Sequence, residues 1–120
     1  MRGLVEQAIP VLQVRDASVS VEWYAQLGFE LEWEHRLGAG FPAFISLKRG
    51  HLRLFLSEHE GGAVQRSVVY LRLTDLDRLG TQLEALEPVP EETEWQTKEI
   101  TLHDPDGNRL RVGIPGPGGR

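Results

Sequence analysis

The chain has 120 residues and a formal net charge of −5, from 13 basic and 18 acidic side chains. Its length fits one domain, and its 40% hydrophobic and 26% charged residues are typical of a folded protein. The absence of cysteine excludes disulfides, zinc–thiolate sites and cysteine nucleophiles. The net negative charge disfavours binding to nucleic acid, and no apolar run reaches the ~18 residues of a membrane span. We therefore expect a cytoplasmic protein that binds neither nucleic acid nor membrane.

The first half of the chain predicts a strand, a helix and then three strands. Alternating apolar residues predict the first strand over residues 8–14. A helix is expected between the N-cap Asp16 and the stop signal Gly28. Its apolar residues recur at helical spacing and are expected to face the core: Val19, Trp23 and Leu27. The following strands are predicted over residues 29–36, 44–47 and 52–57.

The second half repeats this order after a polar, glycine-rich connector at about residues 58–65. Alternation of Val69, Leu71 and Leu73 predicts a strand, and Asp75 begins a helix that Pro88 and Pro90 end. The helix carries a stripe of four leucines, Leu76, Leu79, Leu83 and Leu86. A short strand and the strands 95–103 and 109–114 follow, the last two joined by a turn at residues 104–108. The tail, residues 115–120, is rich in glycine and proline and is expected to be mobile.

The two halves therefore indicate an internal repeat. The segment 11–16 matches 70–75 in polarity, and Gly50 and Gly107 occupy equivalent hairpin turns. We interpret the chain as a single α+β domain of two βαβββ modules, one at about residues 8–57 and one at about 66–114. One such module cannot bury its own sheet face, whereas two modules together can.

Several short motifs, in this order and spacing, resemble a known family. The motifs are Ala8-Ile9-Pro10-Val11-Leu12, Val21-Glu22-Trp23-Tyr24, Leu27-Gly28-Phe29, Leu54-Phe55-Leu56-Ser57 and Asp104-Pro105-Asp106-Gly107-Asn108. Together they resemble the glyoxalase/bleomycin-resistance/dioxygenase (vicinal oxygen chelate) superfamily, and within it most resemble the bleomycin-resistance proteins. The resemblance implies curved mixed sheets that form a cleft, commonly completed by a homodimer with swapped parts. Pro10 is then either a strand-edge residue or the bend where an N-terminal arm crosses to a partner subunit.

The resemblance also implies where a metal would sit. Metal-dependent members place His or Glu at four inward sheet positions, which fall here at Ile9, Phe55, Val68 and Arg111. None of these side chains ligates a divalent ion, so we predict no metal and no cofactor. The four histidines have no metal-binding spacing and are expected at the surface: His35, His51, His59 and His103.

Strand alternation predicts the residues that face the cleft. If Leu12, Leu71 and Leu110 pack under the helices, the alternate residues of the same strands face the cleft. The residues predicted to face it are Val11, Gln13, Phe55, Val68, Tyr70, Arg72, Glu99 and Arg111. Aromatic groups with a carboxylate suit a flat cationic ligand. The candidate ligand-binding residues are Trp33, Phe41, Phe55, Tyr70, Trp95 and Glu99, of which Trp95 and Glu99 also rest on the family resemblance.

Alternatives stay open for these residues. The aromatic side chains also suit a core or a dimer interface, and Glu99 also suits a solvated strand position. Arg72 and Arg111 either pair with Glu99 or indicate an anionic ligand.

The leading functional hypothesis is a metal-independent protein that sequesters a small antibiotic of the bleomycin type without breaking a bond. One alternative is a metal-dependent lyase, isomerase or dioxygenase of the same fold. Another is a binding module for a different small ligand, because the segment 88–94 is short compared with the antibiotic-binding pattern.

Overall fold

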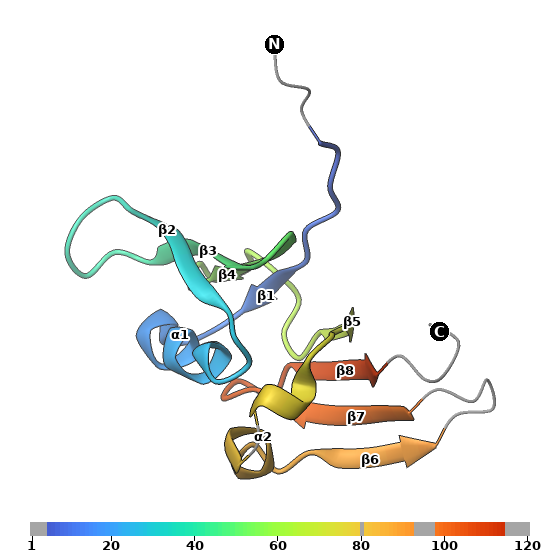
Figure 1. Ribbon diagram of the computed structural model, residues 1–120. Coiled ribbons are helices and arrows are strands. Elements are labelled where there is room, and N and C mark those ends of the chain that lie inside the picture. The colour runs from blue at the N-terminus through green and yellow to red at the C-terminus, as the bar shows by residue number, and fades with distance from the viewer. Residues whose placement is uncertain (1–4, 80, 93–97, 115–120) are drawn as a thin grey trace.

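The molecule consists of two consecutive modules with the same order of elements (Figure 1). The computed structural model describes residues 5–79, 81–92 and 98–114. The first module contains β1 (Val11–Gln13), α1 (Ala17–Ala25), β2 (Glu30–Arg36), β3 (Ala43–Arg49) and β4 (Leu52–Ser57). The second contains β5 (Val68–Arg72), the 3-10 helix η1 (Leu76–Leu79), α2 (Thr81–Ala85), β6 (Val89–Glu92), β7 (Lys98–His103) and β8 (Arg109–Ile114). The predicted α+β fold with two βαβββ modules is confirmed.

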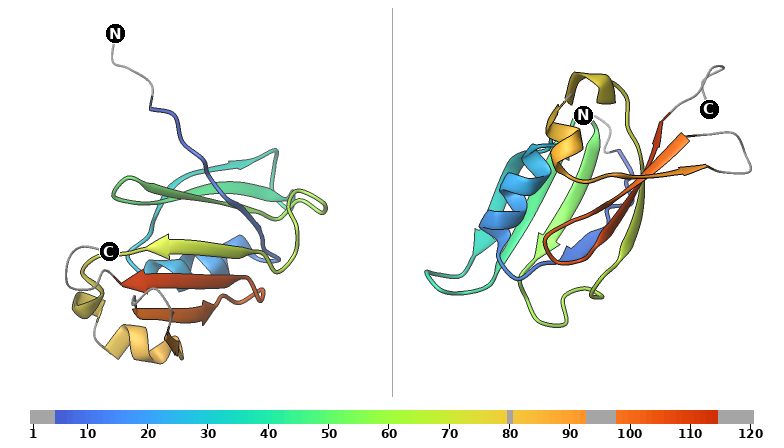
Figure 2. Two further views of the ribbon diagram at one scale, coloured as in Figure 1. Left: turned by 90° about the vertical axis from the view of Figure 1, so that its right-hand side faces the viewer. Right: turned by 90° about the horizontal axis from the view of Figure 1, so that it is seen from below.

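Each module builds its own four-stranded mixed sheet. The strand orders are β1-β4-β3-β2, called sheet A here, and β5-β8-β7-β6, called sheet B. In both, the first strand pairs in parallel with the last, as Val11 with Phe55 and Tyr70 with Arg111, while the other pairs are antiparallel. The right-hand view of Figure 2 shows the strands of the two modules as two separate sets. The repeat in the sequence is thus a repeat of topology.

The predicted strand parity is confirmed by burial. Leu12, Leu71 and Leu110 are buried, and they join one hydrophobic core that contains residues of both modules. On the opposite parity, Val68 and Tyr70 are almost half exposed. Each sheet therefore has one face in the shared core and one face turned away from it.

The predicted buried face of the first helix is confirmed at Leu27, which is fully buried just after α1, but it is shifted by one residue at the other two positions. Val19 is 49% exposed and Trp23 is only partly buried, whereas Ser20 and Tyr24 have no exposed surface. The limits of the helix follow the sequence signals, since the Asp16 carboxylate accepts a hydrogen bond from the Ser18 backbone N–H at the start. Gly28, with a φ of 91°, takes the left-handed conformation just after the end.

The second module departs from the prediction around its helix. The predicted single helix is divided into η1 and α2, although Leu76 and Leu86 are buried and Leu79 and Leu83 pack against the core. Pro90 lies within β6, the edge strand of sheet B, a position where proline is tolerated in a sheet. The beginning of the strand predicted at 95–103 and the tail 115–120 fall outside the described residues.

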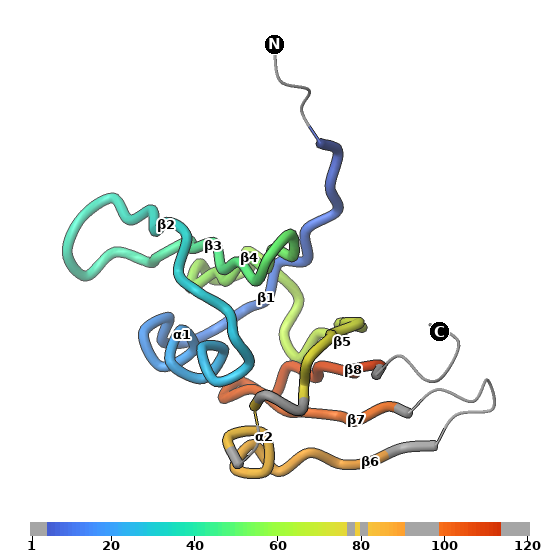
Figure 3. The backbone as a smooth tube through the Cα atoms, in the orientation of Figure 1, coloured from blue at the N-terminus to red at the C-terminus, as the bar shows by residue number. Residues whose placement is uncertain are grey.

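The N-terminal segment leaves the body of the molecule. Figure 3 shows the chain before β1 running away from both sheets, and Val5 is 77% exposed. Within the part of the chain that the structure describes, no helix is long and apolar enough to cross a membrane.

Candidate functional site

Three aromatic rings gather on the outer face of sheet A. The ring centroids of Trp33 and Phe55 are 5.4 Å apart, those of Phe44 and Phe55 are 5.2 Å apart, and those of Trp33 and Phe44 are 6.0 Å apart. Trp33 is 41% exposed, so part of its indole is open to solvent. This surface, called the aromatic face below, offers the stacking area that a flat ligand needs.

A β-bulge positions the tryptophan on this face. The pairing of β2 with β3 shifts register between Leu31 and Trp33, which brings Trp33 opposite Ser46. The extra residue, Glu32, accepts hydrogen bonds from Ser46 Oγ at 2.7 Å and from Arg53 Nε at 2.9 Å. The Ser46 hydroxyl, followed by the Arg53 guanidinium, holds the pKa of Glu32 below its ordinary value. A carboxylate that stays ionised thus borders the rings.

A buried ion pair lies on the outer face of sheet B. Glu99 is 2% exposed, and its Oε1 is 2.7 Å from the Arg111 guanidinium, whose side chain is 37% exposed. Burial of a carboxylate costs free energy unless it is compensated by charge and hydrogen bonds. The prediction left Arg72 and Arg111 open as partners of Glu99, and the structure selects Arg111.

Tyr70 lies beside this pair. It is opposite Arg111 in the β5–β8 pairing, and Glu99 is opposite Gly113 in the β7–β8 pairing. The phenol of Tyr70 lies directly over Gly113, so close that a Cβ there would be 2.2 Å from the phenol oxygen. Glycine at 113 therefore lets the Tyr70 phenol lie close to the backbone of β8. We call the surface of Tyr70, Glu99 and Arg111 the carboxylate face.

The structure brings the predicted residues together in two groups. Trp33 and Phe55 share the aromatic face, while Tyr70 and Glu99 share the carboxylate face. Phe41 is 51% exposed in the loop between β2 and β3, where its carbonyl oxygen accepts a hydrogen bond from Arg36. Trp95 lies outside the described residues. Sheet A and sheet B carry these faces on the sides opposite the shared core.

Comparison with known proteins identifies the family. The model of the family described as "Glyoxalase superfamily protein" matches residues 2–115. The chain belongs to the glyoxalase superfamily. No curated protein gives a significant sequence match.

Solved structures from this superfamily have the same fold. A bleomycin resistance determinant encoded on the transposon Tn5 is 28% identical, with a TM-score of 0.71 over 92% of this chain and 98% of that one. A bleomycin-binding protein complexed with bleomycin is 30% identical, with a TM-score of 0.71 over 93% and 100%. A lactoylglutathione lyase from Agrobacterium tumefaciens is 20% identical, with a TM-score of 0.70 over 94% and 96%, and supports the fold alone.

The residues that the family resemblance places at the metal positions have side chains that do not ligate a metal ion. Phe55 belongs to the aromatic cluster, Val68 is half exposed on sheet B, and the Arg111 cation is paired with Glu99. Ile9 precedes β1 and is half-buried. Among the described residues, no three His, Cys, Asp or Glu side chains form a group that could hold a metal. The histidines His35, His51 and His103 are exposed and His59 is half-buried.

Sequence reasoning missed the Glu32–Ser46–Arg53 network. Strict alternation along β2 puts Glu32 and Trp33 on opposite faces, but the bulge lets both reach the same side of sheet A. Nothing in the sequence around the bulge, such as a glycine, signals it.

Proposed function

We propose that this protein is a cytoplasmic, metal-independent binding protein that sequesters a cationic aromatic or glycopeptide antibiotic of the bleomycin type. The observation that carries the proposal is the exposed aromatic face beside ionised carboxylates. Trp33 offers a partly exposed indole next to Phe55, and Glu32, which is paired with Arg53, places a carboxylate at its edge. Stacking supplies contact area for flat rings, and carboxylates supply charge for cationic groups.

The composition of the carboxylate face supports the same ligand class. Glu99 is buried and its Oε1 is 2.7 Å from the Arg111 guanidinium, whose side chain is 37% exposed. Beside this pair, Tyr70 is 44% exposed and offers a ring for stacking. The two similar bleomycin proteins, one of them complexed with bleomycin, support a binding role of this kind.

The ligand site is completed by a second copy of the chain. Both faces lie opposite the shared core, so one chain does not enclose a ligand between them. In a homodimer, the aromatic face of one subunit covers the carboxylate face of the other, and the exposed segment before β1 is free to cross to the partner. Enclosure between two subunits would bury most of a drug-sized ligand, as tight binding requires.

A fluorescence titration tests the proposal. Metal-free bleomycin is added to protein treated with a chelator, and tryptophan emission is followed, with Trp33→Ala as the site variant and Leu37→Ala, 77% exposed, as the control. We expect saturable quenching in the parent and in Leu37→Ala, and affinity lower by about 1–3 kcal/mol in Trp33→Ala. No saturable quenching in the parent contradicts sequestration of this antibiotic.

The alternative of a metal-dependent enzyme has one supporting observation, the fold shared with a lactoylglutathione lyase. It is tested by loading the protein with zinc, nickel or iron(II) and assaying the hemithioacetal of glutathione and methylglyoxal. We expect no turnover above that of the free metal, because Phe55, Val68 and Arg111 occupy the ligand positions.

A further inference from the structure

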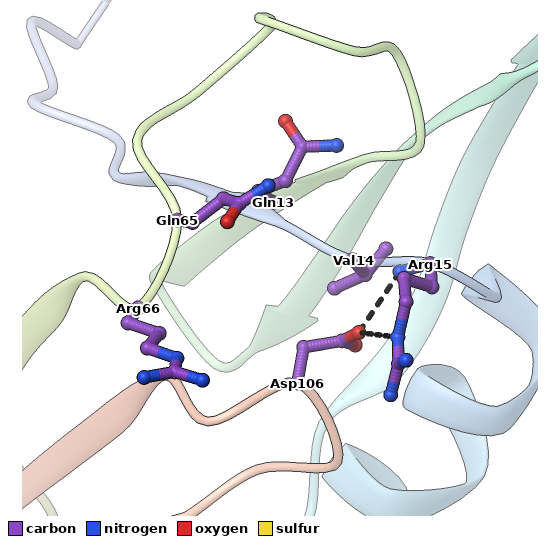
Figure 4. Close-up of a pocket in the computed structure, with 6 residues that line it drawn as sticks. All are labelled: Gln13, Val14, Arg15, Gln65, Arg66 and Asp106. Carbon is purple, nitrogen blue, oxygen red and sulfur yellow. Dashed lines mark hydrogen bonds and ion pairs between the residues drawn. The ribbon is translucent and has the colours of Figure 1, made fainter.

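A cluster of arginine side chains surrounds a cavity at the turn end of sheet B. The cavity, of about 600 Å³, is lined by Arg15, Arg66 and Arg109 together with His103 and Asp106. Arg15 comes from the segment after β1, Arg66 from the loop before β5, and His103 and Arg109 from the ends of β7 and β8. Asp106 lies in the turn between β7 and β8. A smaller cavity of about 220 Å³ adjoins it, shares Arg15, Arg66 and Asp106, and adds the side chains of Gln13 and Gln65. In Figure 4, Asp106 lies between Arg66 and Arg15.

Positive charge exceeds negative charge in this cluster. Three guanidinium groups and an exposed imidazole face one carboxylate among the described lining residues, although the whole chain carries −5. That carboxylate, Asp106, is occupied by Arg15, which donates to its Oδ1 from the backbone N–H at 3.0 Å and from Nε at 3.2 Å. Like charges held together cost free energy, which a bound anion would offset.

The donor groups of the cluster remain available. The Arg15 side chain is 89% exposed and uses Nε on Asp106, so its guanidinium is accessible from solvent. Within the described residues, Arg66 and Arg109 form no ion pair. His103 is directly opposite Arg109 in the β7–β8 pairing, so both side chains leave the same face of the sheet. Forked guanidinium groups match the oxygens of phosphate and sulfate in geometry.

The backbone around Arg66 fixes one of these groups in place. Arg66 has a φ of 56°, in the left-handed region that arginine seldom adopts. Its side chain lies along Gly107, where an added Cβ would be 3.5 Å from Cγ of Arg66. The Ser67 backbone beside it is tied down by Asn108 Oδ1 at 3.0 Å and by the Arg109 N–H at 2.8 Å. A backbone conformation of this kind persists where the surroundings impose it, and it is concentrated at ligand-binding sites.

We propose that Arg15, Arg66 and Arg109 form a binding site for a doubly charged oxyanion, a phosphate or sulfate group. His103 adds an N–H donor at the same opening, and Asp106 orients Arg15. The site shares no residue with the aromatic or carboxylate face, although His103 and Arg109 lie on the same face of sheet B as Glu99 and Arg111, toward the turn end. Phosphate binding and bleomycin binding are measured separately, so either proposal can fail without the other. The oxyanion is either a free inorganic ion or a group on a larger organic ligand, and the chemistry that binds it is the same.

An NMR titration with inorganic phosphate at low ionic strength tests the site. Amide chemical shifts around residues 66, 106 and 109 are expected to move saturably, with a dissociation constant below about 1 mM. Sodium chloride at matched ionic strength provides the control for screening. Phenyl phosphate then separates the two sources: tighter binding than inorganic phosphate indicates a group on an organic ligand, and equal binding indicates the free ion.

Matched variants make the result specific. Arg66→Gly removes a guanidinium while glycine accepts the φ of 56° freely, and Arg109→Gln removes another at the start of β8. Each is expected to weaken phosphate binding at least about tenfold and to keep the dispersed spectrum of the folded protein. Lys48→Ala, in β3 of sheet A, removes an equal charge elsewhere and is expected to leave binding unchanged. Absence of saturable shifts in the parent, or equal weakening by Lys48→Ala, overturns the proposal.

Discussion

The Tyr24 hydroxyl donates a hydrogen bond to Asp104 Oδ2 at 2.8 Å, joining α1 of the first module to the β7–β8 turn of the second. Both side chains are buried, and burial, reinforced by the negative charge of Asp104, raises the pKa of the Tyr24 phenol. Asp104 also accepts from the backbone and the side-chain amide of Asn108, whose Nδ2 donates in turn to the Gln13 carbonyl. The modules are thus held together by a polar network beside the shared apolar core.

Tyr24→Phe tests this link. Removing the hydroxyl takes a donor from a buried carboxylate, so the free energy of unfolding is expected to fall by about 1–3 kcal/mol. Urea unfolding measures it, with Tyr70→Phe, whose ring is 44% exposed, as the control expected within about 0.5 kcal/mol of the parent. Equal effects of the two variants contradict a structural role for the Tyr24–Asp104 bond.

The ion pair on the carboxylate face predicts that removing Arg111 alone destabilises the fold more than removing both charges of the pair. Arg111→Met leaves the buried Glu99 charge without its arginine and is expected to destabilise the fold by about 2–4 kcal/mol. Glu99→Gln combined with Arg111→Met is expected to recover part of that loss, because no charge is then buried at this position. Chemical unfolding of the parent, both single variants and the double variant measures the coupling, and strictly additive losses would show that the pair is uncoupled.

The low pKa of Glu32 predicts a pH-dependent contribution to stability. Because its folded-state pKa lies below the unfolded value, the contribution is present above the ordinary glutamate pKa of about 4.3 and is lost as pH falls through the folded-state pKa. The difference in unfolding free energy between the parent and Glu32→Gln should therefore shrink when the pH is lowered from neutrality to about 3. A difference that is constant over this range contradicts the role assigned to the Ser46 and Arg53 hydrogen bonds.

The proposed dimer predicts the mass of the protein in solution. Light scattering at micromolar concentration is expected to give twice the chain mass of 13.5 kDa. Removal of residues 1–9 tests the arm, since the described part of this segment runs away from both sheets and residues 5–8 are exposed. A truncated protein that remains a dimer shows that the arm is not what holds the subunits together. A full-length protein that is a 13.5 kDa monomer contradicts the dimer itself.

The sequence predicts which side chains of the strands are buried, but it does not predict which side of α1 faces the core. Side chains alternate strictly along a strand, so the buried state of Leu12 and Leu110 follows from the pattern alone. Around α1, apolar residues are spread over several faces, and Tyr24, which carries a hydroxyl, is buried because Asp104 receives its hydrogen bond. That partner is 80 residues away in the chain, so no local pattern reveals it.

The sequence predicts a candidate site residue correctly only where the alternation of side chains along one strand determines the face that the residue occupies. Phe55 and Glu99 follow from parity, but the contact of Trp33 with Phe55 depends on the bulge in β2. The arginine cluster depends on loops that bring together Arg15, Arg66 and Arg109 from distant parts of the chain. The net negative charge of the chain does not predict a cluster of positive side chains.

Calorimetric titration of the metal-free protein with metal-free bleomycin, with and without a chelator, is the most direct test of sequestration. The account predicts saturable binding near one ligand per chain, with the same affinity in both conditions. A ligand at 100 times its dissociation constant should also stabilise the fold by about 2.7 kcal/mol. Absence of heat and of thermal stabilisation, or binding that the chelator abolishes, would contradict it.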